Sequence, residues 1–599
     1  MAAETSKELP DDCWGMIFNN LDDENNLESI SLVSKRFLSI TSSIRVSINV
    51  FSPSVETLSR LLQRFSNLKK IKLQSFTGDL NQAVLTIARS GLDLEELNMS
   101  GIRSLQKVCL QQLSSKMKNL KVLDCSPGAL GDEDAISIAD SFPQLEELQI
   151  ACSSYDDNRK MIVVTDEGID YLSSKLKKLR KINFYYNQHI TDKSLVSLSS
   201  NCAFLEHITV SYCGVTENGI SFLVKNSDQL KTLRLSAHFT VGSSGVTNFP
   251  PNLVFTNVGI SDEFLYSIAE ARIPLTSFSL IFCKSYTFDG ISRLLHSYQS
   301  LNSLDLMGAD FLTNEYVEYL SPFLHSLTSI SLVDSPDLSD SAFIVLTQRC
   351  PLLRHLKMGM SSLGREECNY DGLMKNFAIK CLDLSSNSYL TTSSLKRILN
   401  ISPEVEKIRL SSCFTRNNQL DVADILECNR GLVNMNLAAC QLKVVSRKDA
   451  IISTLKVLDV KSSEITDEVL GMLVRMCPGL VHLDLEDCDE LTEEGVKEVI
   501  KSCKKLRFLS LSACLNVDIN IIAWIVDNSP SLRRLVSPSY SYPDNEEQRH
   551  FLQQGCLVSK VWCLELAAAG VVHQFLKSAG SDFSDQYRLI RCTRELLWL

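Results

Sequence analysis

The chain is organised around one short pattern, leucine-x-x-leucine-x-leucine, which recurs along most of its length. Most copies begin 25 to 27 residues after the previous one. Because the side chains of a strand alternate between two faces, positions one, four and six point inward and positions three, five and seven outward. One copy cannot cover its own apolar face, so we expect neighbouring copies to stack into one continuous parallel sheet. The copies begin at Leu68, Leu94, Leu120, Leu145, Leu179, Leu205, Leu230, Leu275, Leu301, Leu327, Leu353, Ile379, Val405, Leu432, Leu455, Leu480 and Leu506, with a degraded copy near Leu253 and a partial one at Leu532.

The second half of each copy has the residue pattern of a short helix. Threonines precede several of these segments, and acidic residues follow them directly. A threonine hydroxyl can accept a hydrogen bond from an unpaired N–H of the first helical turn, and the acids suit the positive end of the helix dipole. We therefore predict a capped helix after each strand, with Thr191, Thr216, Thr466 and Thr492 as capping residues.

This period and pattern resemble leucine-rich repeats. The resemblance implies an α/β fold, a leucine-rich-repeat solenoid or horseshoe with the parallel sheet inside and the helices outside. We assign residues 68–540 to about 18 or 19 such repeats, residues 45–67 to the cap that precedes them, and residues 541–599 to a C-terminal cap or tail.

Half of the 20 cysteines occupy two fixed positions of the repeat. A small, weakly polar side chain suits a buried turn between stacked units, so we expect a structural role rather than redox or metal chemistry. The arrangement is similar to the cysteine-containing class of leucine-rich repeats. One position holds Cys213, Cys283, Cys413, Cys440, Cys488 and Cys514, and the other holds Cys202, Cys350, Cys477 and Cys503.

Composition argues against several classes of function. The net charge is −11 and the pI is near 5.5, so general binding to nucleic acid or to an anionic membrane is not expected. We find no secretion signal, no apolar run long enough to span a bilayer, and none of the local motifs of zinc, nucleotide or protease sites. We expect an intracellular protein of the nucleus, the cytoplasm or both, with reduced cysteines, no cofactor and no metal.

Residues 9–40 differ from the repeats. Trp14, Ile17, Phe18 and Leu21 share one face at helical spacing, and a second such face follows a polar break at residues 22–26. The sequence therefore predicts two or three short helices. So small a unit buries too little surface to be stable alone, and we expect it to lean on the repeats and on a partner.

This segment resembles an F-box, and we assign residues 1–44 to it. The family pattern is matched by Leu-Pro, an apolar pair, and the run Ser-Leu-Val-x-Lys-Arg-Phe. Together with the repeats, the resemblance is to plant F-box/leucine-rich-repeat proteins. It implies a non-catalytic subunit of an SCF ubiquitin ligase, in which the F-box binds a Skp-family adaptor and through it a cullin. The implied adaptor contacts are Leu9, Pro10, Ile17, Phe18, Leu21, Leu27, Leu32, Val33, Lys35 and Phe37.

The outward strand positions would then hold a protein substrate. They carry a mixture of basic, acidic and aromatic residues, which suits a protein of complementary pattern better than a uniform polyanion. Aromatic residues and arginines are the usual energetic anchors of an interface. The candidates on the strands are Tyr185, His207, Arg234, Lys357 and Arg409.

One repeat, from Leu145 to Leu179, is 34 residues long. Its extra length lies between the strand and the helix, where an insert projects beside the concave face. We hypothesise that this insert touches the substrate through Tyr155, Asp156, Asp157, Arg159 and Lys160.

Two other functions stay open on sequence grounds. The first is a small-molecule hormone co-receptor, as in the auxin and jasmonate receptor families, although those have several long loops and a basic inositol-phosphate site. The second is a non-ligase scaffold built on the repeats. An enzyme is the least expected class, because no nucleophile, base and orienting group recur at the spacing of a known active site.

Overall fold

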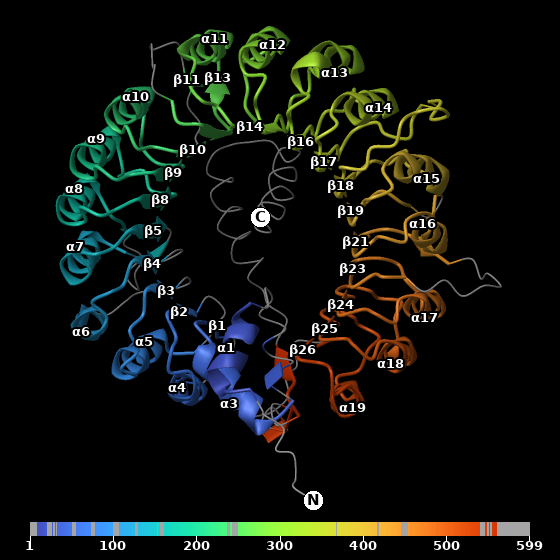
Figure 1. Ribbon diagram of the computed structural model, residues 1–599, viewed down its shortest axis with the longest axis horizontal. Helices are drawn as coiled ribbons and strands as arrows, with labels where there is room; N and C mark the ends of the chain where they lie inside the picture. Colours follow the sequence, from blue (N-terminus) through green and yellow to red (C-terminus); the bar gives the residue numbers. More distant parts are fainter. Residues whose placement is uncertain are drawn as a thin grey trace, which may run out of the picture. The chain divides into compact units, whose positions relative to one another are not determined.

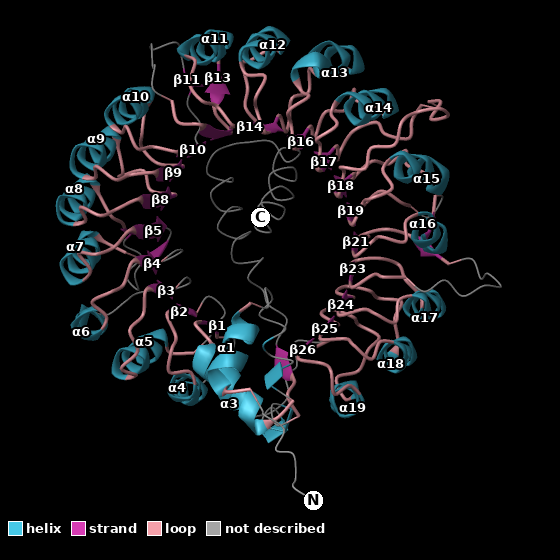
Figure 2. Cartoon of the chain, viewed as in Figure 1, coloured by secondary structure: helices cyan, strands magenta, loops and turns pink. Residues whose placement is uncertain are grey.

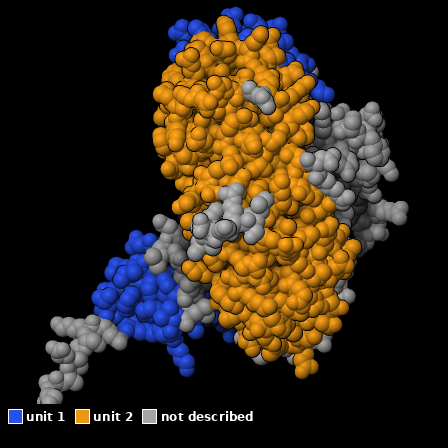
Figure 3. All heavy atoms as spheres, turned by 90° about the vertical axis from the view of Figure 1, so that its right-hand side faces the viewer, with its two compact units in different colours: residues 1–311 blue, residues 312–599 orange. Residues whose placement is uncertain are grey.

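The computed structural model describes most of the chain, and its residues fall into two compact units, 1–311 and 312–599 (Figure 3). The described residues are 9–20, 27, 30–31, 33–50, 55–73, 78–99, 107–125, 130–151, 154–155, 161–236, 240–241, 249–366, 368–415, 418–444, 453–538, 546–547, 550–551 and 554–559.

The first unit begins with two short helices and continues as a strip of parallel strands backed by helices (Figure 1). Its strands pair in the order β1 (Ser47–Asn49), β2 (Lys70–Lys72), β3 (Glu96–Asn98), β4 (Val122–Asp124), β5 (Glu147–Ala151), β8 (Lys181–Tyr185), β9 (His207–Ser211), β10 (Thr232–Ser236), β12 (Asn252–Thr256), β14 (Ser277–Ile281) and β15 (Ser303–Asp305). Its helices are α1 (Asp11–Asn19), α3 (Lys35–Ile44), α4 (Val55–Arg64), α5 (Leu80–Arg89), α6 (Lys107–Lys116), α7 (Asp132–Ser141), α8 (Asp166–Lys175), α9 (Asp192–Asn201), α10 (Glu217–Asn226), α11 (Asp262–Ala271) and α12 (Phe288–Ser297).

The second unit repeats the same plan. Its strands follow the order β16 (Ser329–Ser331), β17 (His355–Lys357), β18 (Cys381–Asp383), β19 (Lys407–Arg409), β21 (Asn434–Asn436), β23 (Val457–Asp459), β24 (His482–Asp484), β25 (Phe508–Ser510), β26 (Arg534–Val536) and β27 (Leu557–Ser559). Its helices are α13 (Asn314–Leu320), the 3-10 turn η1 (Ser321–Phe323), α14 (Asp340–Arg349), α15 (Thr392–Ile401), α16 (Val422–Cys428), α17 (Asp467–Met476), α18 (Glu493–Ser502) and α19 (Ile521–Asn528).

Short two-stranded pairings lie outside these sheets. They join β6 (Ser154–Tyr155) to β7 (Met161–Ile162), β11 (Thr240–Val241) to β13 (Gly259–Ile260), and β20 (Leu420–Asp421) to β22 (Leu442–Lys443). Within each unit the long sheet lines the inner side of the curve and the helices form its outer wall (Figure 2). This confirms the predicted α/β leucine-rich-repeat architecture.

The strand alternation is confirmed residue by residue. In β2 the middle residue Ile71 is buried, whereas Lys70 and Lys72 point away from the core. The degraded copy near Leu253 is a true repeat, because β12 pairs in register with β10 on one side and β14 on the other. Each leucine of the pattern therefore packs between the sheet and the helices, and this packing excludes apolar surface from water.

The four predicted threonine caps are also confirmed. Thr191, Thr216, Thr466 and Thr492 each accept a hydrogen bond from an N–H of the first helical turn. The ten regularly spaced cysteines are buried. One set donates its thiol to a main-chain carbonyl of the preceding repeat, as Cys413 does to Leu384 at 3.0 Å and Cys514 to Leu485 at 3.0 Å. Cysteines of the other set lie at the C-terminal ends of helices, as Cys503 does at the end of α18.

One connection departs from the prediction of a helix in every repeat. Between β17 and β18, the described residues 358–366 and 368–380 form turns and bends without a helix. Gly364 and Gly372 adopt positive φ angles of 84° and 78°, which a right-handed helix does not contain. Tyr370 links this segment to the start of α14, because its hydroxyl donates a hydrogen bond to buried Asp340 at 2.7 Å.

Candidate partner-binding surfaces

The two N-terminal helices are held together by three aromatic rings. The ring centroid of Phe37 on α3 lies 4.9 Å from that of Trp14 and 5.1 Å from that of Phe18, both on α1. Such tilted and edge-on contacts are the favoured geometry of aromatic pairs. Ser34 caps α3 by accepting a hydrogen bond from the N–H of Phe37 at 3.1 Å. The cap and the rings therefore fix where α3 begins relative to α1.

An arginine ties the start of α1 to α3. The Nε of Arg36 donates to Asp11 at 2.7 Å, and one terminal nitrogen donates to the main-chain oxygen of Leu9 at 2.6 Å. A guanidinium offers several donors in a fixed geometry, so one side chain can hold both acceptors. The Leu-Pro segment is thereby held against the helix pair.

Four apolar side chains of this segment face solvent rather than the core. Val33 is 68% exposed, Met16 61%, Leu9 45% and Ile17 44%. Exposed apolar residues that cluster on one small unit mark an interaction surface more often than chance exposure does. We call these four residues the exposed apolar surface.

Three predicted substrate residues lie on three neighbouring strands of the first unit. Tyr185 ends β8, His207 begins β9 and Arg234 lies at the centre of β10. Burial raises the pKa of Tyr185, and the positive charge of Arg234 partly opposes this shift. Burial likewise lowers the pKa of His207, and the nearby acid Glu206 opposes that shift.

A pair of tyrosines lies at the strand ends beside these residues. The rings of Tyr186 and Tyr212 are stacked, with centroids 5.1 Å apart and planes 5° from parallel. Asn257 donates to the Tyr212 hydroxyl at 2.8 Å, which fixes the outer ring. Both tyrosines have positive φ angles, 54° and 53°, at the repeat position where the main chain leaves the strand. Their N–H groups donate to the next strand, Tyr186 to Ser211 at 2.8 Å and Tyr212 to Ser236 at 2.6 Å.

On the second unit, basic residues surround one half-buried thiol. His355, Cys381 and Lys407 are neighbours in register on β17, β18 and β19. Lys357 and Arg409 flank Asp383 in the same way, and Arg409 approaches that acid to 3.7 Å. Burial raises the pKa of Cys381, while the charges of the neighbouring cations oppose the shift.

Further along the second unit an aromatic stack crosses the sheet. The rings of His482 and Phe508 lie 4.1 Å apart and 8° from parallel, and the guanidinium of Arg534 lies 5.6 Å from the Phe508 centroid. Burial lowers the pKa of His482, and the neighbouring Asp484 opposes the shift. The lowered pKa favours the neutral form of the His482 ring.

The N-terminal residues match a known family. Residues 7–49 match the model described as F-box domain. The N-terminal segment is an F-box domain.

Three plant proteins are similar to the chain that contains this F-box. One is a putative F-box/LRR-repeat protein 23 of Arabidopsis thaliana, 26% identical over 24% of this chain and 28% of its own length. A transport inhibitor response 1-like protein of Oryza sativa subsp. japonica is 24% identical over 42% of each chain. GRR1-like protein 1 of Arabidopsis thaliana is 22% identical over 54% of this chain and 60% of its own length. The chain thus spans less than two thirds of each relative and, like the F-box/LRR-repeat protein among them, joins an F-box to leucine-rich repeats.

Two solved structures are also similar. One is a chain of the complex of Rad7 and Elc1 in yeast, at 17% identity and a TM-score of 0.40, covering 67% of this chain and 92% of that one. The other is the TLR13–ssRNA13 complex, at 15% identity and a TM-score of 0.42, covering 82% of this chain and 68% of that one.

The predicted contacts of the F-box divide into three groups. Leu9, Pro10, Ile17, Val33 and Lys35 are exposed, and Leu27 and Phe37 are half-buried. Phe18 is only 3% exposed, so it supports the surface from beneath rather than forming part of it. We expected Ile17 and Phe18 to share one helical face, but Ile17 is exposed whereas Phe18 is buried. Leu21 and Leu32 lie outside the described residues.

The predicted substrate residues are not all brought together. Tyr185, His207 and Arg234 lie on three neighbouring strands of the first unit at different positions along them. Lys357 and Arg409 lie on either side of Asp383 on the second unit. Of the insert, the backbone of Tyr155 pairs with Met161 in a hairpin, and its side chain is not described. Asp156, Asp157, Arg159 and Lys160 lie outside the described residues. Our predictions from the sequence did not include the tyrosine pair, although a tyrosine directly follows the strand in two successive repeats.

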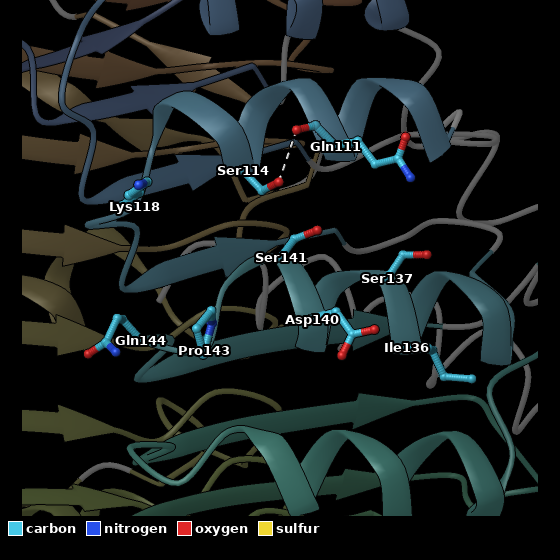
Figure 4. Close-up of a pocket in the computed structure, with 9 residues that line it drawn as sticks. All are labelled: Gln111, Ser114, Lys118, Ile136, Ser137, Asp140, Ser141, Pro143 and Gln144. Atoms are coloured by element: carbon cyan, nitrogen blue, oxygen red, sulfur yellow. Dashed lines mark hydrogen bonds between the residues drawn. The ribbon is translucent and has the colours of Figure 1, made fainter.

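A further groove lies between α6 and α7 on the helix side of the first unit (Figure 4). Asp140 on its wall accepts a hydrogen bond from Tyr171 of α8 at 2.8 Å, so its polar lining also joins neighbouring helices. Among the described residues, no group of three His, Cys, Asp or Glu side chains could hold a metal ion. In the same part of the chain, no helix has the length and apolar character needed to cross a bilayer.

Proposed function

We propose that this protein is the substrate-recognition subunit of an SCF-type ubiquitin ligase. The F-box binds a Skp-family adaptor, and through it a cullin, while the inner repeat surface binds a protein substrate. The protein acts in the nucleus, the cytoplasm or both. It supplies position rather than catalytic groups, because holding a substrate lysine near a charged ubiquitin-conjugating enzyme raises its effective concentration.

One observation carries this proposal: an F-box domain that presents exposed apolar side chains is joined to a long leucine-rich-repeat sheet. On this proposal the exposed apolar surface of Leu9, Met16, Ile17 and Val33 meets the adaptor. It is supported by an aromatic cluster in which buried Phe18 packs with the half-buried rings of Trp14 and Phe37. The unit is small, so its stability rests on that cluster and on burial of this surface by a partner. The repeats supply the broad second surface that a folded substrate needs.

Co-purification tests the adaptor half of the proposal. The full chain and a variant with both Ile17→Asp and Val33→Asp are produced together with a Skp-family adaptor. We expect the native chain to retain the adaptor and the variant to lose most of it, because a charge cannot be buried at an apolar contact without a large cost. Equal recovery by the two proteins would contradict the proposal.

A matched control is Val196→Asp, which places the same charge at a partly exposed valine of α9. This variant should retain the adaptor as the native chain does. Protein that lacks residues 1–44 should lose it. For the substrate half, a bound protein should be ubiquitinated only when adaptor and cullin are both present, and degradation that does not need the cullin would indicate a scaffold instead.

A small-molecule co-receptor is a second proposal, and one observation favours it. Arg234 is exposed and forms no salt bridge with another described residue, and its positive charge acts on the Tyr185 hydroxyl. A guanidinium with no salt-bridge partner among the described residues suits the carboxylate of a small aromatic acid as well as that of a peptide. Shifts of the unfolding temperature with plant hormones and inositol phosphates would support this second function.

A further inference from the structure

We infer that the edge formed by Tyr185, Tyr186, Tyr212 and Arg234 binds an extended substrate segment that carries an acidic residue near a proline or an aromatic residue. Arg234 takes the carboxylate, and the stacked tyrosines take the planar side chain. The inference rests on the proposed function in treating the repeat surface as the substrate surface, and it names the class of substrate.

The charge of Arg234 is the first step. Its neighbours in register are Thr209 on β9 and Val254 on β12, and neither is an acid. Glu206, which directly precedes β9, is engaged by Lys231 at 3.1 Å. Arg234 itself is exposed at the centre of β10. A carboxylate from outside is therefore the acceptor that this guanidinium lacks, and arginine binds carboxylates through paired hydrogen bonds.

The tyrosine pair is the second step. Tyr186 is 40% exposed although the pair is stacked, so part of its ring area remains for a further planar group. Asn257 holds Tyr212 from the other side, and the main-chain hydrogen bonds at the two positive-φ positions fix both Cα atoms. Rigid aromatic rings with few rotatable bonds lose little entropy on binding, and prolines and aromatic side chains are the usual groups that pack on them.

The distance between these features favours a peptide over a small molecule. Tyr212 directly follows β9 and lies three residues beyond Thr209, which pairs with Arg234 on the neighbouring strand β10. Neighbouring strands are about 4.8 Å apart and rise about 3.3 Å per residue, so the Cα atoms of Tyr212 and Arg234 are roughly 11 Å apart. An extended segment covers that distance in about three residues. The bound segment should therefore place its acid and its ring two to four residues apart, roughly the span set by these strands.

The chain beside this edge departs from the repeat. β5 pairs in register with β8, so that Ala151 lies opposite Tyr185, and the long insert begins directly after Ala151. The connection that carries the β6–β7 hairpin therefore leaves the sheet next to the tyrosines. Function concentrates where irregular connections meet a rigid scaffold, which agrees with a specific site at this edge.

Selection from a displayed library of random twelve-residue peptides tests the inference. The target is the full chain bound to its adaptor, or the full chain alone if the adaptor does not bind. We expect enriched peptides to share an acid two to four residues from a proline or an aromatic residue. Arg234→Ala and the double variant Tyr186→Ala, Tyr212→Ala should each weaken a selected peptide at least about tenfold, the usual cost of losing an interface anchor.

Two further variants allow the result to be interpreted even if one substitution disturbs folding. Arg234→Glu should reverse the charge preference, so that lysine or arginine replaces the acid among enriched peptides. Lys72→Ala, which removes a cation at the same strand position of β2, should leave binding unchanged. Unchanged enrichment with Arg234→Glu, or a consensus without an acid, would overturn the inference.

The remaining outcomes separate this inference from its alternatives. Binding of small aromatic carboxylic acids at Arg234, without enrichment of any peptide, would overturn it in favour of a small-molecule site. Loss of adaptor binding with an intact peptide consensus would remove the proposed ligase role and leave the peptide site standing. Adaptor binding without a peptide consensus would overturn the peptide site and leave the proposed ligase role standing.

Discussion

Asp467 of α17 accepts two hydrogen bonds from Thr492, the residue that caps α18 in the next repeat, at 2.9 Å from its N–H and 2.5 Å from its hydroxyl. Thr492 in turn accepts a hydrogen bond from the first turn of its own helix. A Cβ atom at Gly495 would collide with the carboxylate of Asp467, so a larger residue there would force that carboxylate to move. The same relation links Asp192 to Thr216 and Gly219. The helices of successive repeats are therefore joined through their caps.

Breaking this joint should destabilise the second unit. We expect Asp467→Ala to lower the free energy of unfolding by about 1–3 kcal/mol, because it leaves Thr492 without its acceptor. Gly495→Ala should cost a similar amount by forcing a methyl group onto the carboxylate. Urea unfolding followed by circular dichroism measures both effects.

Glu468→Ala is the matched control, since it removes an exposed acid from the same helical turn. Its unfolding midpoint should stay close to that of the native protein. A midpoint for Asp467→Ala equal to that of the control would show that the joint contributes nothing.

Much of this architecture was predictable because it depends on period and side-chain type. The leucine positions, the threonine caps and the buried cysteines repeat many times, and each copy obeys the same packing rule. The joint itself was not predicted, although a glycine three residues after the capping threonine is visible at Gly219 and Gly495. Its meaning depends on the acid of the preceding repeat, which only the stacked structure brings into contact.

Features that occur once were harder to predict. The absence of a helix before β18 is explained by Gly364 and Gly372. Their positive φ angles could not be predicted from the repeat period. The outward position of Ile17 depends on which face of α1 the Phe37 ring covers. The concave residues were correctly placed on strands, but the grouping of Tyr185 with Arg234 and of Lys357 with Arg409 required the register of pairing.

The F-box separates residues that support the surface from residues that form it. We expect Phe18→Ala to destabilise the helix pair by about 3–5 kcal/mol, because it leaves a cavity beside the Trp14 and Phe37 rings that Phe18 contacts. Val33→Ala should leave stability nearly unchanged and weaken adaptor binding. Proteolysis near residue 20 and co-purification with the adaptor measure the two properties. Stronger destabilisation by Val33→Ala than by Phe18→Ala would reverse these roles.

The cysteines should differ in reactivity according to burial. Cys428 at the end of α16 is exposed, whereas Cys413, Cys440, Cys488 and Cys514 are buried. Burial also raises the pKa of Cys514 to about 12, and only the thiolate reacts readily. Brief treatment with iodoacetamide, followed by peptide mass spectrometry, should therefore modify Cys428 and spare the other four. Equal modification without urea would mean that the repeats open on the timescale of the reaction.

The same burial predicts a loss of stability at alkaline pH. The pKa values of Cys477, Cys503 and Cys514 rise from 9.0 to about 12, because burial penalises the thiolate. A raised pKa in the folded state stabilises the protein fully below pH 9 and progressively less as the pH rises toward 12. Each thiol should steepen the fall in unfolding free energy by about 1 kcal/mol per pH unit once the pH is well above 9.

Urea unfolding at several alkaline pH values should show a shallower fall when the three cysteines are alanine. Cys428→Ala should leave the slope unchanged, and an unchanged slope in the triple variant would show that these thiols do not control it.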